Sequence, residues 1–205
     1  MSYDAISTIH DIAAMLAIVA LVGAILMLAA RVIPSVASVR FLDAIYRVQL
    51  PLAAIVPVTA MSFSLYFSEG GEQWIPCRWC WFQRICMYSL AVILTVAAIR
   101  RDRRVKWFAV PLAILGICAS TWHILIEHRI VEESAACFNV QTCASPWRVS
   151  FGTLDFSTGT LVTSGMPITL AVMAFCGFAA ILALLLTPEP LEPLEAEEDG
   201  QSSAR

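Results

Sequence analysis

Charged residues are scarce in this chain. They make up 14% of its 205 residues, whereas 59% are hydrophobic, and the mean hydropathy is +0.76. A water-soluble domain of this size cannot bury so much apolar surface, so the composition predicts an integral membrane protein in contact with the lipid bilayer. The sequence also lacks an internal repeat and a glycine-rich phosphate-binding loop, and its net charge of −3 gives no reason to expect a nucleic-acid partner.

Charge is almost absent from the long apolar stretches. Five stretches are long enough to cross a hydrocarbon core of about 30 Å. They cover Ile12–Ala30, Val48–Phe67, Trp81–Ile99, Trp107–Ile126 and Met166–Leu186. Only the third contains a charged residue, Arg84. Because the stretches lack the alternation of barrel strands, we expect an all-α integral membrane protein with five helical spans.

The leading segment has no lysine or arginine, so it does not resemble a cleavable signal peptide. Basic residues gather instead in two loops, after the first and after the third span. They are Arg31, Arg40, Arg47, Arg100, Arg101, Arg103, Arg104 and Lys106. The positive-inside rule predicts that both loops are cytoplasmic and that the N-terminus is outside. Residues 187–205 are acidic and rich in proline, which predicts a disordered cytoplasmic tail.

Four of the seven cysteines lie in loops. Cys77 and Cys80 lie at the start of the third span, and Cys137 and Cys143 lie between the fourth and fifth spans. Two spans separate the pairs, so both emerge on one face, which the basic loops predict to be outside, where disulfides persist. The other three cysteines fall within spans and are interpreted as packing residues. These are Cys86, Cys118 and Cys176.

Three chemistries are open to the loop cysteines: redox activity, structural disulfides or zinc binding. The wide spacing of Cys137 and Cys143 argues against zinc, so we expect no metal. Two short disulfide rings would constrain little chain, which argues against a purely structural role. Short rings are readily strained and prone to exchange, so redox-active pairs are favoured.

Arg84 lies one helical turn beyond Cys80 and on the same face. A charge at the bilayer centre costs about 2.5–3.5 kcal/mol on insertion scales, so it needs a reason, either a bound polar group or snorkelling to the interface. The helix N-terminus and nearby arginines favour a thiolate at Cys80. Gln83 and Arg84 offer hydrogen-bond donors beneath that sulfur, which suits a lipid-soluble acceptor such as a quinone.

Two further segments are interpreted more simply. His123, Glu127 and His128 are expected to be interface polar residues, with a proton relay as the alternative. Between the second cysteine pair and the fifth span, Trp147 and Leu154 belong to an apolar series at helical spacing. This series predicts a segment lying in the headgroup layer as a lid over the cysteines.

The motif Cys77-x-x-Cys80-Trp-Phe-Gln-Arg84, followed two spans later by a second pair, resembles the signature of the DsbB/BdbC family of disulfide-generating membrane proteins. The resemblance covers a DsbB-like four-span core, residues 36–186, and leaves residues 1–35 as an extra N-terminal transmembrane helix. The close spacing of Cys137 and Cys143 is similar to that of the BdbC branch.

The resemblance implies a bacterial plasma-membrane enzyme that oxidises a DsbA-like thioredoxin-fold partner and reduces ubiquinone or menaquinone. It implies that the partner attacks at Cys137, that Cys143 attacks Cys77, and that Cys80 passes electrons to quinone near Arg84. Two alternatives stay open. One is a quinone reductase of the vitamin-K-epoxide type, and the other is a non-enzymatic membrane subunit braced by structural disulfides.

Overall fold

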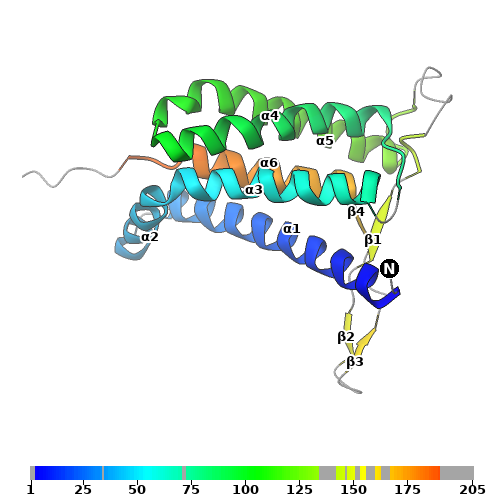
Figure 1. Cartoon of the computed structure of the whole chain (residues 1–205). Coiled ribbons are helices and arrows are strands. Elements are labelled where there is room, and N and C mark those ends of the chain that lie inside the picture. The colour runs from blue at the N-terminus through cyan, green and yellow to red at the C-terminus, as the bar shows by residue number, and fades with distance from the viewer. Residues whose placement is uncertain are drawn as a thin grey trace, which may run out of the picture.

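Long helices form nearly all of the described structure. The computed structural model describes residues 3–33, 35–70, 73–133, 142–145, 147–150, 153–155, 160–162 and 167–189. The long helices are α1 (Tyr3–Val32), α3 (Gln49–Leu65), α4 (Arg78–Arg100), α5 (Lys106–Glu127) and α6 (Leu170–Leu185). They lie side by side in one bundle (Figure 1). The predicted all-α bundle is confirmed.

Four of these helices are long and apolar enough to cross a membrane among the described residues: α1, α3 with its extension, α4 and α5. The fifth, α6, is shorter at 16 residues. It begins at Leu170 rather than at the predicted Met166, because Pro167–Thr169 pair as a strand and the Thr169 side chain caps the helix by accepting from the Val172 N–H at 3.3 Å.

The connections contain elements that the sequence analysis did not predict. Helix α2 (Val36–Arg47) follows α1, and the Ser35 side chain caps it by accepting from the Ser38 N–H at 3.1 Å. A short π-helix, η1 (Tyr66–Gly70), extends α3, and a short 3₁₀-helix, η2 (Arg103–Val105), precedes α5.

The segment after the second cysteine pair contains strands, although its apolar residues recur at helical spacing, and its predicted position in the headgroup layer stays a prediction. Strand β1 (Arg148–Ser150) pairs antiparallel with β4 (Pro167–Thr169), with Val149 opposite Ile168. Strand β2 (Thr153–Asp155) pairs with β3 (Thr160–Val162). Pairing with β4 joins this loop to the start of α6, and Leu170 N–H also donates to Trp147 O at 3.2 Å. These contacts fix the backbone at Trp147.

The main core lies between α3, α4, α5 and α6. Its fully buried side chains include Leu90 and Leu94 of α4, and Phe178 and Ile181 of α6. Helices α5 and α6 pack tightly at Gly116 of α5, where an added Cβ would overlap the Phe178 ring of α6. Glycine is therefore required at this crossing for the two helices to pack.

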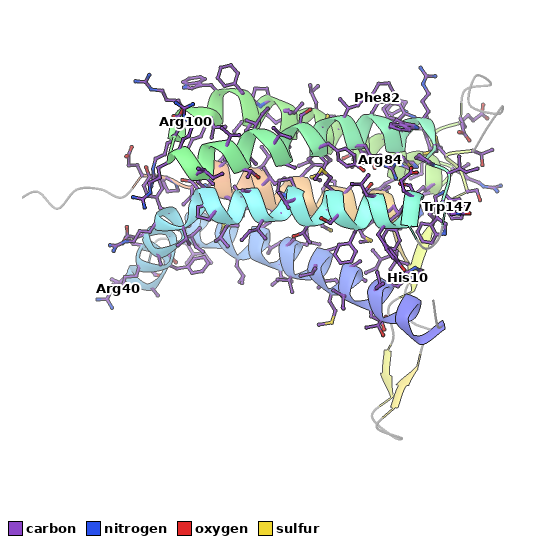
Figure 2. The ribbon with its side chains drawn as sticks, viewed as in Figure 1. His10, Arg40, Phe82, Arg84, Arg100 and Trp147 are labelled. Carbon is purple, nitrogen blue, oxygen red and sulfur yellow. The ribbon has the colours of Figure 1, made fainter. Side chains whose placement is uncertain are left out.

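The bundle has two chemically different ends. The cysteine end carries Cys77, Cys80 and Cys143, and the basic end carries most of the arginines. Figure 2 shows Arg40 and Arg100 at one end of the bundle and His10, Arg84 and Trp147 toward the other. The strands and the start of α1 lie at the cysteine end, and α2 lies at the basic end (Figure 1). At the basic end the first residues of the predicted tail are packed, since Thr187 is 1% exposed and Glu189 accepts from the Tyr46 hydroxyl at 3.0 Å. The tail beyond Glu189 lies outside the described residues.

Candidate active site

The Cys77–Cys80 pair is built into the first turn of α4. Cys77 is the N-cap, with extended backbone angles (φ −73°, ψ 174°), and its Sγ accepts from the Cys80 N–H at 3.4 Å. The two sulfurs are 2.9 Å apart, and both cysteines are free thiols. A disulfide needs a separation of about 2.05 Å, so a small movement of the side chains suffices to form it.

Cys143 reaches this pair from the other cysteine loop. It is 1% exposed and packs in a cluster with Cys77 and Ile126. The carboxylate of Glu133 holds its backbone, accepting from the Cys143 N–H at 2.6 Å and from the Ala144 N–H at 3.3 Å. Cys143 therefore lies at the same end of the bundle as Cys77 and Cys80, as the number of intervening spans predicted, and Cys137 lies outside the described residues.

Cys77 and Cys143 are close enough to shift each other's pKa. The hydrogen bond with Cys143 lowers the pKa of Cys77, but the hydrogen bond with Cys80 and burial raise it, and the outcome is a pKa of about 12. The hydrogen bond with Cys77, followed by burial, raises the pKa of Cys143 well above its usual range. Both thiols therefore keep their protons at neutral pH in this reduced arrangement, and a thiolate has to form during exchange.

His123 of α5 belongs to the site, although the sequence analysis favoured an interface role for it. Its Nε2 is 3.5 Å from Cys77 Sγ and 3.7 Å from Glu127 Oε1, and its Nδ1 is 3.2 Å from Gln83 Nε2. The His123 and Glu127 side chains are each 4% exposed, and Glu127 accepts from the Thr169 hydroxyl at 2.8 Å. The Glu127 carboxylate and Gln83 thus orient the imidazole toward Cys77.

An apolar cavity of about 280 Å³ opens beside Cys80. Gln83 and Arg84 line it together with Cys80, as the shared helix face predicted. The Arg84 guanidinium donates to Ser64 O at 3.2 Å and lies 5.5 Å from the centre of the Trp81 ring. Helices α1, α3, α4 and α6 supply the apolar walls. The cavity therefore has one polar end, next to the dithiol, and an apolar remainder.

Trp147 covers the site from the strand-containing loop. It stacks on Trp74 with ring centres 5.0 Å apart and planes 9° apart, and its Nε1 donates to Ile75 O at 3.1 Å. Trp147 lines both the apolar cavity and a small pocket beside Cys77 and His123. Trp147 is thus the described residue of the predicted lid segment that lies beside the cysteines, and the lid itself stays a prediction.

The cysteine and histidine side chains of the site could also hold a metal ion. The ligand atoms of Cys77, Cys80 and His123 lie within 4.8 Å of one another. Structural zinc is almost always held by four ligands. The absence of a metal therefore stays a prediction. Cys77, Cys80 and His123 would also be arranged in this way if they formed a redox dithiol with a histidine as hydrogen-bond partner.

Several known proteins are similar to this chain in sequence. The family model "Disulfide bond formation protein DsbB" matches residues 46–187. A probable disulfide formation protein of Deinococcus radiodurans is 40% identical over 142 residues, which cover 68% of this chain and 88% of the relative. Disulfide bond formation protein C of Bacillus subtilis is 48% identical over 71 residues, covering 35% of this chain and 51% of the relative. No solved structure matches the chain significantly.

The family match includes α3, α4, α5 and α6, and with them every described residue of the dithiol site. It begins at residue 46, so α1 lies outside it. The apolar helices agree with a multi-pass membrane protein. The chain therefore belongs to the DsbB family of disulfide bond formation proteins, a family of membrane disulfide oxidoreductases.

Proposed function

We propose that this protein is a thiol:quinone oxidoreductase of a bacterial plasma membrane that oxidises a DsbA-like thioredoxin-fold partner. The observation that carries the proposal is the order of the thiols. Buried Cys143 lies beside Cys77, Cys77 contacts Cys80, and Cys80 lines the apolar cavity. This order supports electron transfer from a loop thiol to an acceptor dissolved in the membrane.

The cavity suits a quinone. Ligand pockets span about 300–1,000 Å³, and the cavity of about 280 Å³ is near the lower end of that range. Its apolar walls suit the ring and tail, and the donors of Gln83 and Arg84 suit the carbonyl oxygens. A bound quinone would supply a two-electron, two-proton acceptor, and ubiquinone and menaquinone both meet that description.

The loop cysteines have separate roles in the relay. The partner's thiolate attacks the Cys137–Cys143 disulfide at Cys137 and releases Cys143 as a thiolate. Cys143 then attacks Cys77 and breaks the Cys77–Cys80 bond, so that Cys80 leaves as a thiolate. The partner's second thiol releases Cys137, which re-forms its disulfide with Cys143 and leaves Cys77 and Cys80 reduced.

The electrons and protons balance over this sequence. The partner loses two electrons and two protons, which then reside on the Cys77–Cys80 dithiol. A quinone held in the cavity would accept both as the Cys77–Cys80 disulfide re-forms, and Cys80 is the sulfur that lines the cavity. Arg84, at the same end of the cavity, would stabilise negative charge on such an acceptor.

His123 acts on the reacting sulfur of Cys77. When the Gln83 amide donates to Nδ1, the neutral imidazole carries its hydrogen on Nε2, the nitrogen 3.5 Å from Cys77 Sγ. That hydrogen stabilises Cys77 when it leaves Cys143 as a thiolate, in the step in which Cys137 re-forms its disulfide with Cys143. Glu127, whose Oε1 lies 3.7 Å from the same Nε2, is itself held by the Thr169 hydroxyl.

The alternative functions account for less of this arrangement. An enzyme of the vitamin-K-epoxide type would carry its Cys-x-x-Cys after the loop pair, whereas here Cys77 and Cys80 come first. A subunit with purely structural disulfides would not need a histidine beside Cys77 or a cavity beside Cys80. It would also keep its disulfides when a reduced partner is added.

The relay is tested with a partner that retains only its nucleophilic cysteine. Mixed with the oxidised protein, it should form a disulfide with Cys137, and mass mapping should then find Cys143 bonded to Cys77 and Cys80 free. Cys118→Ser, at an exposed position on α5 outside the relay, should behave as the wild type. A partner adduct on Cys77 or Cys80, with Cys137 and Cys143 still paired, would contradict the proposal.

A further inference from the structure

Helix α1 lies outside the residues that the DsbB family model matches, yet it forms part of the cavity. Five of the lining residues belong to it: Ala13, Leu16, Ala17, Val19 and Ala20. The four-helix core alone would therefore leave this side of the cavity open as a groove. In this chain a fifth helix covers it.

Helix α1 is packed into cores of buried side chains near both of its ends, and the apolar cavity lies between these contacts. At the cysteine end, Ala13 and Ala14 pack in a cluster with Phe67 and Val149, and the His10 ring meets Phe67 at 5.4 Å. Toward the basic end, Met27 joins the main core. Along its length α1 packs mainly on α6 and makes little contact with α3.

The edge of the cavity between α1 and α3 is open. Leu16, Val19 and Ile55 line the cavity and are nevertheless 44%, 63% and 59% exposed. Side chains that are both lining and exposed mark a rim. All three are aliphatic and lie in spans, so this rim faces lipid tails.

The small side chains of α1 decide how much room lies behind this rim. Ala17 is 9% exposed and lines the cavity, so its methyl group is the wall at this point. A larger residue there has no lipid-facing direction to take and would extend into the cavity. Gly177 of α6, which also lines the cavity, has no side chain to fill it.

We propose that α1 is the fourth wall of the quinone site, and that the isoprenoid tail leaves the cavity sideways between α1 and α3, past Leu16, Val19 and Ile55. This inference rests on the proposed quinone function. It assigns to the additional helix the control of quinone access and of the tail length that is bound. The polar end at Cys80 and Arg84 fixes the headgroup, so the tail points toward the open rim.

The test measures equilibrium binding of quinones to the purified full chain by quenching of tryptophan fluorescence, which is independent of turnover. Trp74 and Trp147 line the cavity and serve as reporters. Ala17→Phe should weaken binding of a short-chain quinone by about tenfold or more, because the phenyl ring would occupy space in the cavity that the quinone fills. Val22→Phe, at a position 48% exposed that is not part of the lining, is the matched control and should bind as the wild type.

A second variant keeps the test decisive if Ala17→Phe does not fold. Ile55→Phe, which adds no tryptophan to the fluorescence signal, narrows the rim. It should weaken binding of a long-tailed quinone by about tenfold while a quinone without a tail binds as before. The role of α1 would be overturned if Ile55→Phe bound both quinones as tightly as the wild type and Ala17→Phe bound the short-chain quinone as tightly as the wild type.

The outcomes also separate this inference from the proposed function. If the wild type shows no saturable quinone binding, or if added phospholipid displaces all of it, the cavity takes an acyl chain and the quinone function itself fails. If the wild type binds quinone and the α1 and rim variants bind equally well, the function stands and only the wall and exit route are wrong.

Discussion

At the scale of single residues, the contacts of Arg84 explain how its charge is tolerated inside a membrane span. Its guanidinium is half-buried, donates to the backbone of Ser64 and lies near the Trp81 ring, at the polar end of the cavity. A snorkelling side chain would instead extend to the interface. The sequence was sufficient to place Arg84 and Gln83 on the face of Cys80, because helical spacing alone determines that relation.

We predict that Arg84→Gln impairs quinone reduction while thiol exchange among the loop cysteines continues. A hydrogen bond to a charged group contributes about 1.5–3 kcal/mol, so the quinone KM should rise or turnover should fall by about ten- to a hundredfold. Arg84→Lys should restore only part of the loss, because an ammonium lacks the planar fork. Steady-state kinetics with varied quinone measure both effects. Arg78→Gln, at an exposed position beside the dithiol, is the control. Unchanged quinone kinetics in folded Arg84→Gln would reduce Arg84 to an anchor.

His123 shows where reasoning from one sequence falls short. Its spacing from Glu127 indicated a shared helix face, but the contact with Cys77 crosses from α5 to α4 over 46 positions in the chain. Only packing reveals such a contact. The burial of His123, at 3% exposed, is likewise a tertiary property that residue type does not determine.

We predict that His123→Ala slows the step in which Cys77 leaves Cys143 as a thiolate while Cys137 re-forms its disulfide with Cys143. Losing the hydrogen bond to the departing thiolate should cost about ten- to a hundredfold in rate. Rapid mixing with a reduced partner, followed by acid quench and thiol counting, measures the step. The exposed neighbour His128→Ala serves as control. If His123→Ala exchanges as fast as His128→Ala, the imidazole has no part in the relay.

At the scale of elements, the spans were predictable and their connections were not. Long apolar runs determine the spans because a membrane admits only helices that satisfy their own backbone. The strand pair β1–β4 joins residues 148–150 to residues 167–169, so the local apolar pattern around Trp147 did not reveal it. Helix α2 was missed although Ser35 is a typical N-cap residue, because the basic residues there were interpreted only as a topology signal.

The crossing of α5 and α6 gives an element-scale prediction. Gly116→Val would drive its side chain into the buried Phe178 ring and should destabilise the bundle by about 1–3 kcal/mol, as overpacking usually does. Thermal unfolding in detergent should show a lower midpoint. Gly23→Val, where an added Cβ meets nothing within 4 Å, is the matched control and should unfold as the wild type. Equal midpoints for the two variants would mean that α5 and α6 are packed less closely.

At the scale of the whole molecule, both cysteine loops meet at one end and most arginines lie at the other. The number of spans between the two cysteine loops predicts that they share an end, and the positive-inside rule predicts that the arginine-rich end faces the cytoplasm.

We predict that Cys77, Cys80, Cys137 and Cys143, once reduced, react with an impermeant thiol reagent added outside intact cells. Cys77 and Cys143 should react slowly, since they are 4% and 1% exposed. Labelling only after permeabilisation would reverse the orientation.

The most direct test of the account follows quinone absorbance while a reduced thioredoxin-fold partner is added to the purified, oxidised protein. One quinone should be reduced for each partner dithiol oxidised, because two electrons and two protons pass through Cys143, Cys77 and Cys80 in turn. Cys143→Ala should abolish the signal, and Cys118→Ser should retain it. Oxidation of the partner without loss of quinone, or quinone reduction that persists in Cys143→Ala, would contradict the account.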